Sequence, residues 1–111
     1  MTEEATFVSG SLSAQVRDED GVVVVHLAGE FDMAGAPTVE QQITSALRPN
    51  SQLVVDLTSV TFMDSSGLGV LARTKHLCDE QETQLTVRIG DSAVRRVLDL
   101  AGLNEHLNVQ D

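Results

Sequence analysis

Ser65 is the residue of this chain whose type and setting best suit a chemical modification. It belongs to the run Phe62-Met63-Asp64-Ser65-Ser66-Gly67-Leu68, which follows an apolar stretch and precedes a helical pattern. A hydroxyl in the first turn of a helix faces the positive end of the helix dipole, which favours an added anion by about 0.3–1 kcal/mol. The setting therefore predicts that Ser65 can accept a phosphoryl group.

The same turn also allows a plainer interpretation. Asp64 or Ser65 can serve only as the N-cap of the helix, where a side-chain oxygen accepts a bond from a free backbone N–H and contributes ~1 kcal/mol. Gly67 and Gly69 favour the functional interpretation modestly, because glycine is a poor helix former that is useful where backbone or a partner must approach closely. Spacing alone leaves both interpretations open.

Hydrophobic periodicity predicts the elements that must position this turn. Alternation predicts a half-buried strand over residues 11–17, and Asp20-Gly21 predicts a hairpin turn into an apolar strand over 22–28, buried on both faces. Further strands are predicted over 53–57 and 84–89. Helical spacing predicts one helix beginning near Ala36, a second after Asp64, and a third over 92–101 that Asp91 or Ser92 caps.

This order of elements predicts an α/β fold. The first hairpin is antiparallel, and the strand–helix–strand units that follow require parallel pairing. We expect a small mixed β-sheet covered by amphipathic helices. At 111 residues the chain suggests a single domain, 1–111, with residues 1–8 frayed.

Composition and charge limit the possible partners. The formal net charge of −10 would repel DNA and anionic membranes. No stretch approaches the ~20 apolar residues of a membrane span, and the acidic N-terminus is unlike a secretory signal. A single cysteine, Cys78, excludes an internal disulfide, so we expect a cytoplasmic protein. No metal-ligand spacing is present, and no cofactor is expected.

The region from Phe62 to Leu71 resembles the signature of the STAS family, specifically the bacterial anti-sigma factor antagonists. The Gly29-Glu30-Phe31-Asp32 run is similar to the strand exit of that family, and the Leu53–Leu57 stretch to the strand before its signature. Residues 93–103 are similar to its last helix. The resemblance spans residues 10–109 and implies a STAS-like fold. It also implies that Ser65, the first serine after the aspartate, is the phosphoacceptor.

The resemblance further implies a partner-switching function without catalysis by this chain. The unmodified protein would bind an anti-sigma factor that is also a serine kinase, and so free the sigma factor. Phosphorylation of Ser65 would release it, and a serine phosphatase would restore it. The partner-binding residues would lie around the strand exit and the serine turn, and we expect a monomer when the protein is free. These residues are Glu30, Phe31, Asp32, Met33, Asp64, Ser66, Gly67 and Leu68.

Two other interpretations, a response-regulator receiver and a serine hydrolase, are weaker. Asp56, near the end of an apolar strand, is where a response-regulator receiver holds its phosphoacceptor, but the acidic pair and well-placed lysine of such a site are missing. A serine hydrolase would need a glycine two residues before Ser65, and Met63 stands there. His76 lies about 16 Å along the helix from Ser65, too far to act as its base, and His106 could approach only through the fold. Local hydrogen bonding for Asp56 and His26, and a core position for Cys78, are the favoured interpretations.

Two further functions remain as alternatives to partner switching. A STAS domain can serve as a scaffold in another signalling assembly, or bind a small ligand or nucleotide at the same helix N-terminus.

Overall fold

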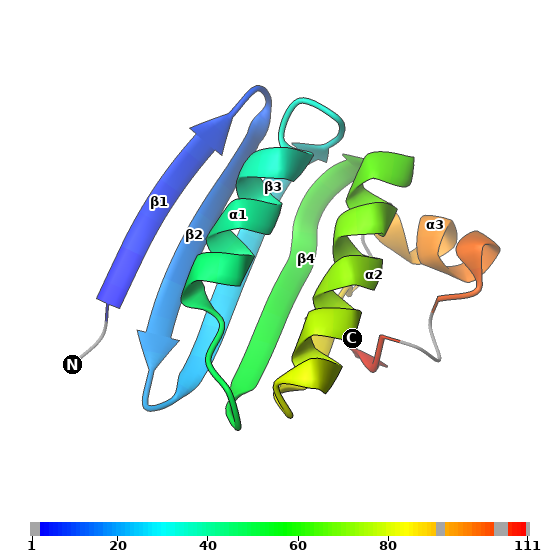
Figure 1. Cartoon of the computed structure of the whole chain (residues 1–111). Coiled ribbons are helices and arrows are strands. Elements are labelled where there is room, and N and C mark those ends of the chain that lie inside the picture. The colour runs from blue at the N-terminus through cyan, green and yellow to red at the C-terminus, as the bar shows by residue number, and fades with distance from the viewer. Residues whose placement is uncertain (1–2, 91–92, 104–106, 111) are drawn as a thin grey trace.

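Six strands and three helices make up the protein in a computed structural model, which describes residues 3–90, 93–103 and 107–110 (Figure 1). In chain order they are β1 (Glu3–Ser9), β2 (Leu12–Glu19), β3 (Val22–Phe31), α1 (Ala36–Ala46), β4 (Gln52–Met63), α2 (Ser65–Glu80), β5 (Gln84–Arg88), α3 (Val94–Ala101) and β6 (Val109–Gln110). One sheet contains all six strands, in the same order as the sequence. The predicted α/β class with a mixed sheet is confirmed.

Two tight hairpins begin the sheet. β1 and β2, and then β2 and β3, pair antiparallel, and the second turn contains Asp20 and Gly21, both with positive φ angles of 52° and 86°. This left-handed conformation matches the right-handed twist of the flanking strands. From β3 onward every pairing is parallel. The antiparallel hairpin and the parallel units therefore occur where the sequence predicts them.

The expectation that residues 1–8 are frayed is wrong for most of that segment. Glu3–Ser9 pairs along its length with β2, from Glu3 opposite Asp18 to Ser9 opposite Leu12. Gly10, with a φ of 62°, allows the tight turn that folds β1 back onto the sheet. Backbone pairing thus holds this segment as an edge strand, although its sequence begins with two glutamates.

Helices α1 and α2 lie side by side on one face of the sheet, as Figure 1 shows, while α3 lies beyond α2 and contacts β4. β3 therefore alternates: Val23, Val25 and Leu27 are buried under the helices, whereas Val22, Val24 and His26 on the opposite face are only half-buried. The expectation that this strand is buried on both faces is wrong, because no helix of the described chain covers the second face. We call that second face the open face.

β4 is longer than predicted because it contains two β-bulges. His26 pairs with Asp56 but Ala28 pairs with Ser59, and Gly29 pairs with Val60 but Glu30 pairs with Phe62, so β4 has an extra residue at each step. Within β4, burial falls on every third residue from Leu57 through Val60 to Met63. A bulge disrupts the alternation by which a strand is found in a sequence. The predicted short connection between strand and helix is in fact strand.

Asp56 and Thr61 make hydrogen bonds at the two bulges. The Thr58 backbone N–H and hydroxyl donate to Asp56 Oδ1 at 2.9 and 2.7 Å, and His26 Nδ1 lies 3.1 Å from Asp56 Oδ2. The Thr61 hydroxyl donates to the Gly29 carbonyl at 3.2 Å. The predictions that Asp56 bonds local backbone and that His26 is a hydrogen-bonded strand residue are both confirmed.

The third helix is shorter than predicted, beginning at Val94 and ending at Ala101. Gly102 follows as its C-cap, with a φ of 70° in the left-handed conformation of a helix stop. The predicted caps Asp91 and Ser92 lie outside the described residues. Cys78 is fully buried, and this desolvation raises the pKa of its thiol to about 11, as expected of a core cysteine.

The Asp56 interactions predict a pH-dependent contribution to stability. Partial burial raises the pKa of Asp56, but the hydrogen bonds from Thr58 and His26 outweigh that effect, so the pKa is lowered below 3.8. A lowered folded-state pKa stabilises the protein above the unfolded value, and the stabilisation is lost as pH falls through the folded value. We expect Asp56→Asn to lower the melting temperature at pH 7, with the difference from wild type shrinking below about pH 4. Melting curves from pH 2.5 to 7 test this, with the exposed Glu30→Gln as control; a pH-independent difference for Asp56→Asn would contradict it.

Candidate functional site

Ser65 lies at the sheet edge where β3 and β4 both end. These strands are parallel, and their last residues, Phe31 and Met63, are register partners. The Asp64 N–H donates to the Phe31 carbonyl at 3.4 Å, so the start of α2 is tied to the end of β3. Helices α1 and α2 begin at this same edge, near the top of Figure 1. Carboxyl ends of parallel strands are where α/β sheets commonly bind ligands.

Asp64, not Ser65, caps the second helix. Asp64 Oδ1 accepts the Ser66 backbone N–H at 2.9 Å, and the Asp64 carbonyl accepts the Leu68 N–H at 3.2 Å. Ser65 is exposed, and its hydroxyl makes no hydrogen bond within the part of the chain that the structure describes. The capping role, which spacing alone could not assign, therefore belongs to Asp64. The Ser65 hydroxyl therefore stays exposed, with no hydrogen bond to another described residue.

The turn from β3 into α1 lies beside Ser65 and is held by Asp32. The Ala34 N–H donates to Asp32 Oδ1 at 3.0 Å, and the Gly35 and Ala36 N–H groups donate to the Asp32 carbonyl at 3.1 and 2.9 Å. This local bonding is typical of aspartate in a turn. It holds the turn in a shape that leaves the Met33 side chain 75% exposed. Pro37, in the first turn of α1, follows where a missing N–H does no harm.

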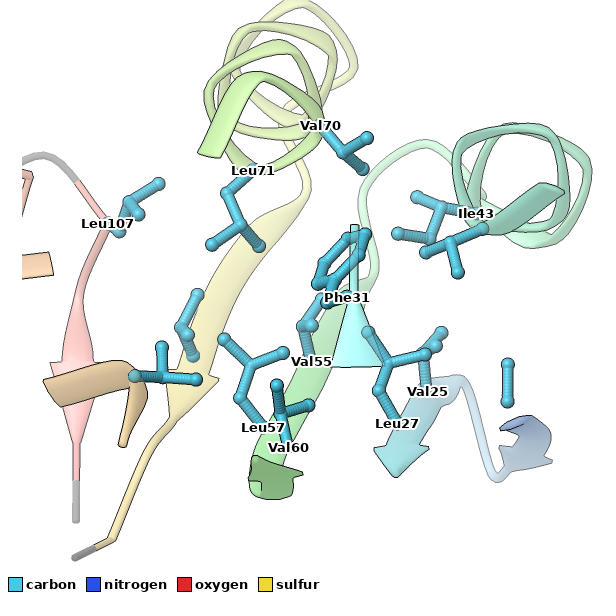
Figure 2. Packing of buried hydrophobic residues seen from close by; sticks show 14 of the residues in the cluster. Val25, Leu27, Phe31, Ile43, Val55, Leu57, Val60, Val70, Leu71 and Leu107 are labelled. Atoms are coloured by element: carbon cyan, nitrogen blue, oxygen red, sulfur yellow. The ribbon is translucent and has the colours of Figure 1, made fainter. Parts of the chain in front are cut away.

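Two of the predicted partner-binding residues are buried and cannot offer side chains to a partner. Phe31 is fully buried, and Figure 2 shows its ring among the core residues Val25, Leu27, Val55 and Val70. Gly67 is also buried at the start of α2. The prediction that Phe31 contacts a partner is therefore wrong, because the register of β3 turns its side chain under the helices. The exposed residue of that loop is Met33.

Sequence reasoning missed Phe62. This side chain is 49% exposed and lies in register with Glu30 across the parallel strands β3 and β4. It faces outward because the second bulge in β4 turns both Thr61 and Phe62 away from the core. A large exposed aromatic side chain in a chain with few aromatics could have drawn attention, but its exposure depends on a bulge that no sequence pattern indicates.

We call the surface formed at these strand ends the Ser65 edge. Glu30, Met33, Phe62 and Ser65 are exposed there, while Asp32, Asp64, Ser66 and Leu68 are half-buried. The Ser65 edge thus combines the Ser65 hydroxyl with exposed apolar side chains and three carboxylates. A separate hollow of about 700 Å³ lies on the open face, and none of its lining residues belongs to the Ser65 edge.

Side chains that could serve other chemistry are engaged in contacts of their own where the structure describes them. Among the described residues, no group of three or more His, Cys, Asp or Glu side chains is placed to hold a metal. His76 pairs with Glu80 at 2.9 Å, and His106 lies outside the described residues. Asp56 is bonded on the open face and Lys75 pairs with Asp79 on α2, so a receiver-type pair is not formed. No helix of the described chain is long and apolar enough to cross a membrane.

Comparison with known sequences and structures agrees with this geometry. The STAS domain profile matches residues 13–111. The chain belongs to the STAS domain family. A Paenibacillus polymyxa anti-sigma F factor antagonist is 31% identical over 91% of this chain and 88% of its own length. The Mycobacterium tuberculosis anti-sigma-F factor antagonist RsfB is 34% identical over 86% of this chain and 78% of its own.

A solved structure shows the same fold. The crystal structure of an anti-sigma factor antagonist from Mycobacterium paratuberculosis superposes with a TM-score of 0.81 and is 37% identical, covering 92% of this chain and 89% of its own. The resemblance stated from the sequence motifs is thus confirmed. The STAS relatives named here are all called anti-sigma factor antagonists.

Gly67 lets this STAS domain begin α2 directly against the strand ends. A Cβ placed there would lie 2.7 Å from Met63 Cγ and 3.1 Å from both Phe31 Cγ and the Phe31 carbonyl. We expect Gly67→Ala to destabilise the protein by about 1–3 kcal/mol through overpacking. Gly69→Ala is the matched control, because its Cβ would meet only the flexible Arg73 guanidinium at 3.1 Å and alanine favours a helix by up to ~1 kcal/mol. Urea unfolding measures both, and equal effects would contradict the packing argument.

Proposed function

We propose that this STAS domain is an anti-sigma factor antagonist switched by phosphorylation of Ser65. In this proposal the unphosphorylated protein binds an anti-sigma factor that is also a serine kinase, in the cytoplasm, and so releases a sigma factor. The kinase phosphorylates Ser65 and the complex separates; a serine phosphatase restores the binding form. The chain is ligand and substrate in this cycle and catalyses none of its steps.

One observation carries the proposal: the Ser65 hydroxyl is exposed and has no hydrogen bond to another described residue, while Asp64 caps the helix. A serine needed only for helix stability would occupy the capping role itself. The hydroxyl stands instead at the exposed edge from which a kinase active site can approach it. The naming of relatives at 31–34% identity as anti-sigma factor antagonists supports the identity of the partner class.

The Ser65 edge has the composition of a protein interface. Met33 and Phe62 supply exposed apolar area, and Glu30 and Asp32 supply negative charge. Phenylalanine and methionine are enriched at protein interfaces, where a few well-packed anchors contribute most of the affinity. An acidic edge on a chain of net charge −10 favours a partner surface that is basic around an apolar centre.

Electrostatics explains how one phosphate could reverse binding. A phosphoserine carries about −1.5 to −2 charges at pH 7, next to the carboxylates already at this edge. An interface that excludes water would strengthen their repulsion, and a loss of about 1.4 kcal/mol is a tenfold loss of affinity. The lost hydroxyl donor would leave any acceptor on the partner unpaired.

A pull-down from native lysate tests the switch. We expect wild type and Ser65→Ala to retain a small ATP-binding kinase and Ser65→Glu to lose it, with at least tenfold weaker binding when the captured protein is purified and titrated. That purified protein should also transfer phosphate from ATP to wild type but not to Ser65→Ala. Equal retention by all three baits, or capture of proteins without kinase activity, would favour the scaffold or ligand-binding alternatives.

The interface composition gives an independent prediction. We expect Met33→Ala and Phe62→Ala each to weaken kinase binding by more than about fivefold, since truncating a buried anchor typically costs over 1 kcal/mol. Leu100→Ala is the control, because Leu100 is 80% exposed but belongs to α3 and is not one of the residues that define the Ser65 edge. Calorimetric titration compares the three. If Leu100→Ala weakens binding as much as the other two, the partner docks elsewhere.

A further inference from the structure

Arg73 on α2 is tied to Glu40 on α1 by a two-point ion pair. Arg73 Nε lies 2.6 Å from Glu40 Oε2, and Nη2 lies 3.0 Å from Oε1. Two parallel bonds fix the plane of the guanidinium as well as its position. The third nitrogen, Nη1, makes no hydrogen bond within the described part of the chain. Arg73 is therefore oriented, and both N–H donors of Nη1 stay unused within the described part of the chain.

Those unused donors lie over Gly69. A Cβ at Gly69 would be 3.1 Å from Arg73 Nη1 and 3.5 Å from Nη2. Long side chains on helices point back toward the N-terminus, and the guanidinium here reaches one turn back along α2. Gly69 is itself one turn, about 6 Å, after Ser65. Because Gly69 has no side chain, it does not block the space between the Arg73 guanidinium and Ser65.

Arg73 is the first basic residue of α2 after Ser65, and the charges around the serine are otherwise acidic. Glu30, Asp32 and Asp64 lie at the Ser65 edge, and Glu40 lies one turn into α1. The next cation on α2, Lys75, is paired with Asp79. Of the other basic side chains, Arg48 pairs with Asp18, Arg95 donates to the Gly90 carbonyl, Arg17 and Arg88 line the hollow on the open face, and Arg96 is exposed on α3.

We propose that Arg73 is the cation that receives the phosphate on Ser65, with Glu40 holding it in position until the phosphate is present. This inference rests on the proposed phosphorylation of Ser65 and names a group that regulates the modified state. A phosphate drawn toward Arg73 is partly neutralised by this chain, in competition with Glu40. Ser65 phosphorylation thereby loosens the ion pair that joins α1 to α2.

The titration of phosphoserine at position 65 tests this directly. Phosphoserine is inserted at that position during translation of the full chain, and its second pKa, ordinarily near 6, is followed by phosphorus NMR. At a separation of about 6 Å, one helical turn, a cation in a water-like dielectric lowers that pKa by roughly half a unit. We expect Arg73→Gln to raise it by about that amount, Arg73→Lys to raise it less, and Glu40→Gln to lower it.

Lys75→Gln is the matched control, since it removes an equal charge from the same helix at a residue already paired with Asp79. Its shift should be less than half that of Arg73→Gln. An unchanged pKa in Arg73→Gln, or an equal shift in Lys75→Gln, would overturn the proposal. Because no kinase is used, this result is independent of the pull-down: the contact can hold while no kinase acts on Ser65, and the switch can hold while Arg73 takes no part.

Discussion

The close approach of α2 to the ends of β3 and β4 is the constraint on which the rest of the site depends. It is possible only because residue 67 has no side chain: Phe31 and Met63 occupy the volume that a Cβ would need. With the helix start held there, Asp64 reaches both the Phe31 carbonyl and its own capping contact to Ser66. The packing of Gly67 against Phe31 and Met63 thus positions both the core beneath α2 and the exposed Ser65 at its start.

The same contact divides the loop between core and surface. Phe31 is drawn under the helices by the strand register, and two residues later Met33 is exposed on a turn held by Asp32. On the neighbouring strand β4, the two bulges likewise bury the Met63 side chain and turn Phe62 outward. Each of the two strands therefore brings an exposed apolar side chain to the Ser65 edge: Met33 follows β3 and Phe62 lies in β4. Neither side chain belongs to the core.

Much of this fold follows from the sequence because periodicity and turn chemistry agree. The antiparallel hairpin at Asp20-Gly21, the parallel units and the helix after Asp64 were predictable from patterns spanning only a few residues. β1 was not, because its pairing with β2 is decided by the neighbouring strand and not by its own acidic sequence. The end of β4 was missed for a related reason: bulges replace the two-residue alternation with burial at every third residue, which resembles neither strand nor helix.

For the site, residue identity was easier to predict than side-chain direction. The motif identifies Ser65 and Asp64, but spacing alone could not decide which of them caps the helix, because both are good N-caps. Three-dimensional contacts separate them, since only Asp64 reaches the Ser66 N–H. Likewise, Phe31 and Met33 are both apolar residues near one strand exit, and only the register decides that the first is core and the second is surface. The Ser65 edge is thus specified less by which residues are present than by the bulges and close contacts that turn a few of them outward.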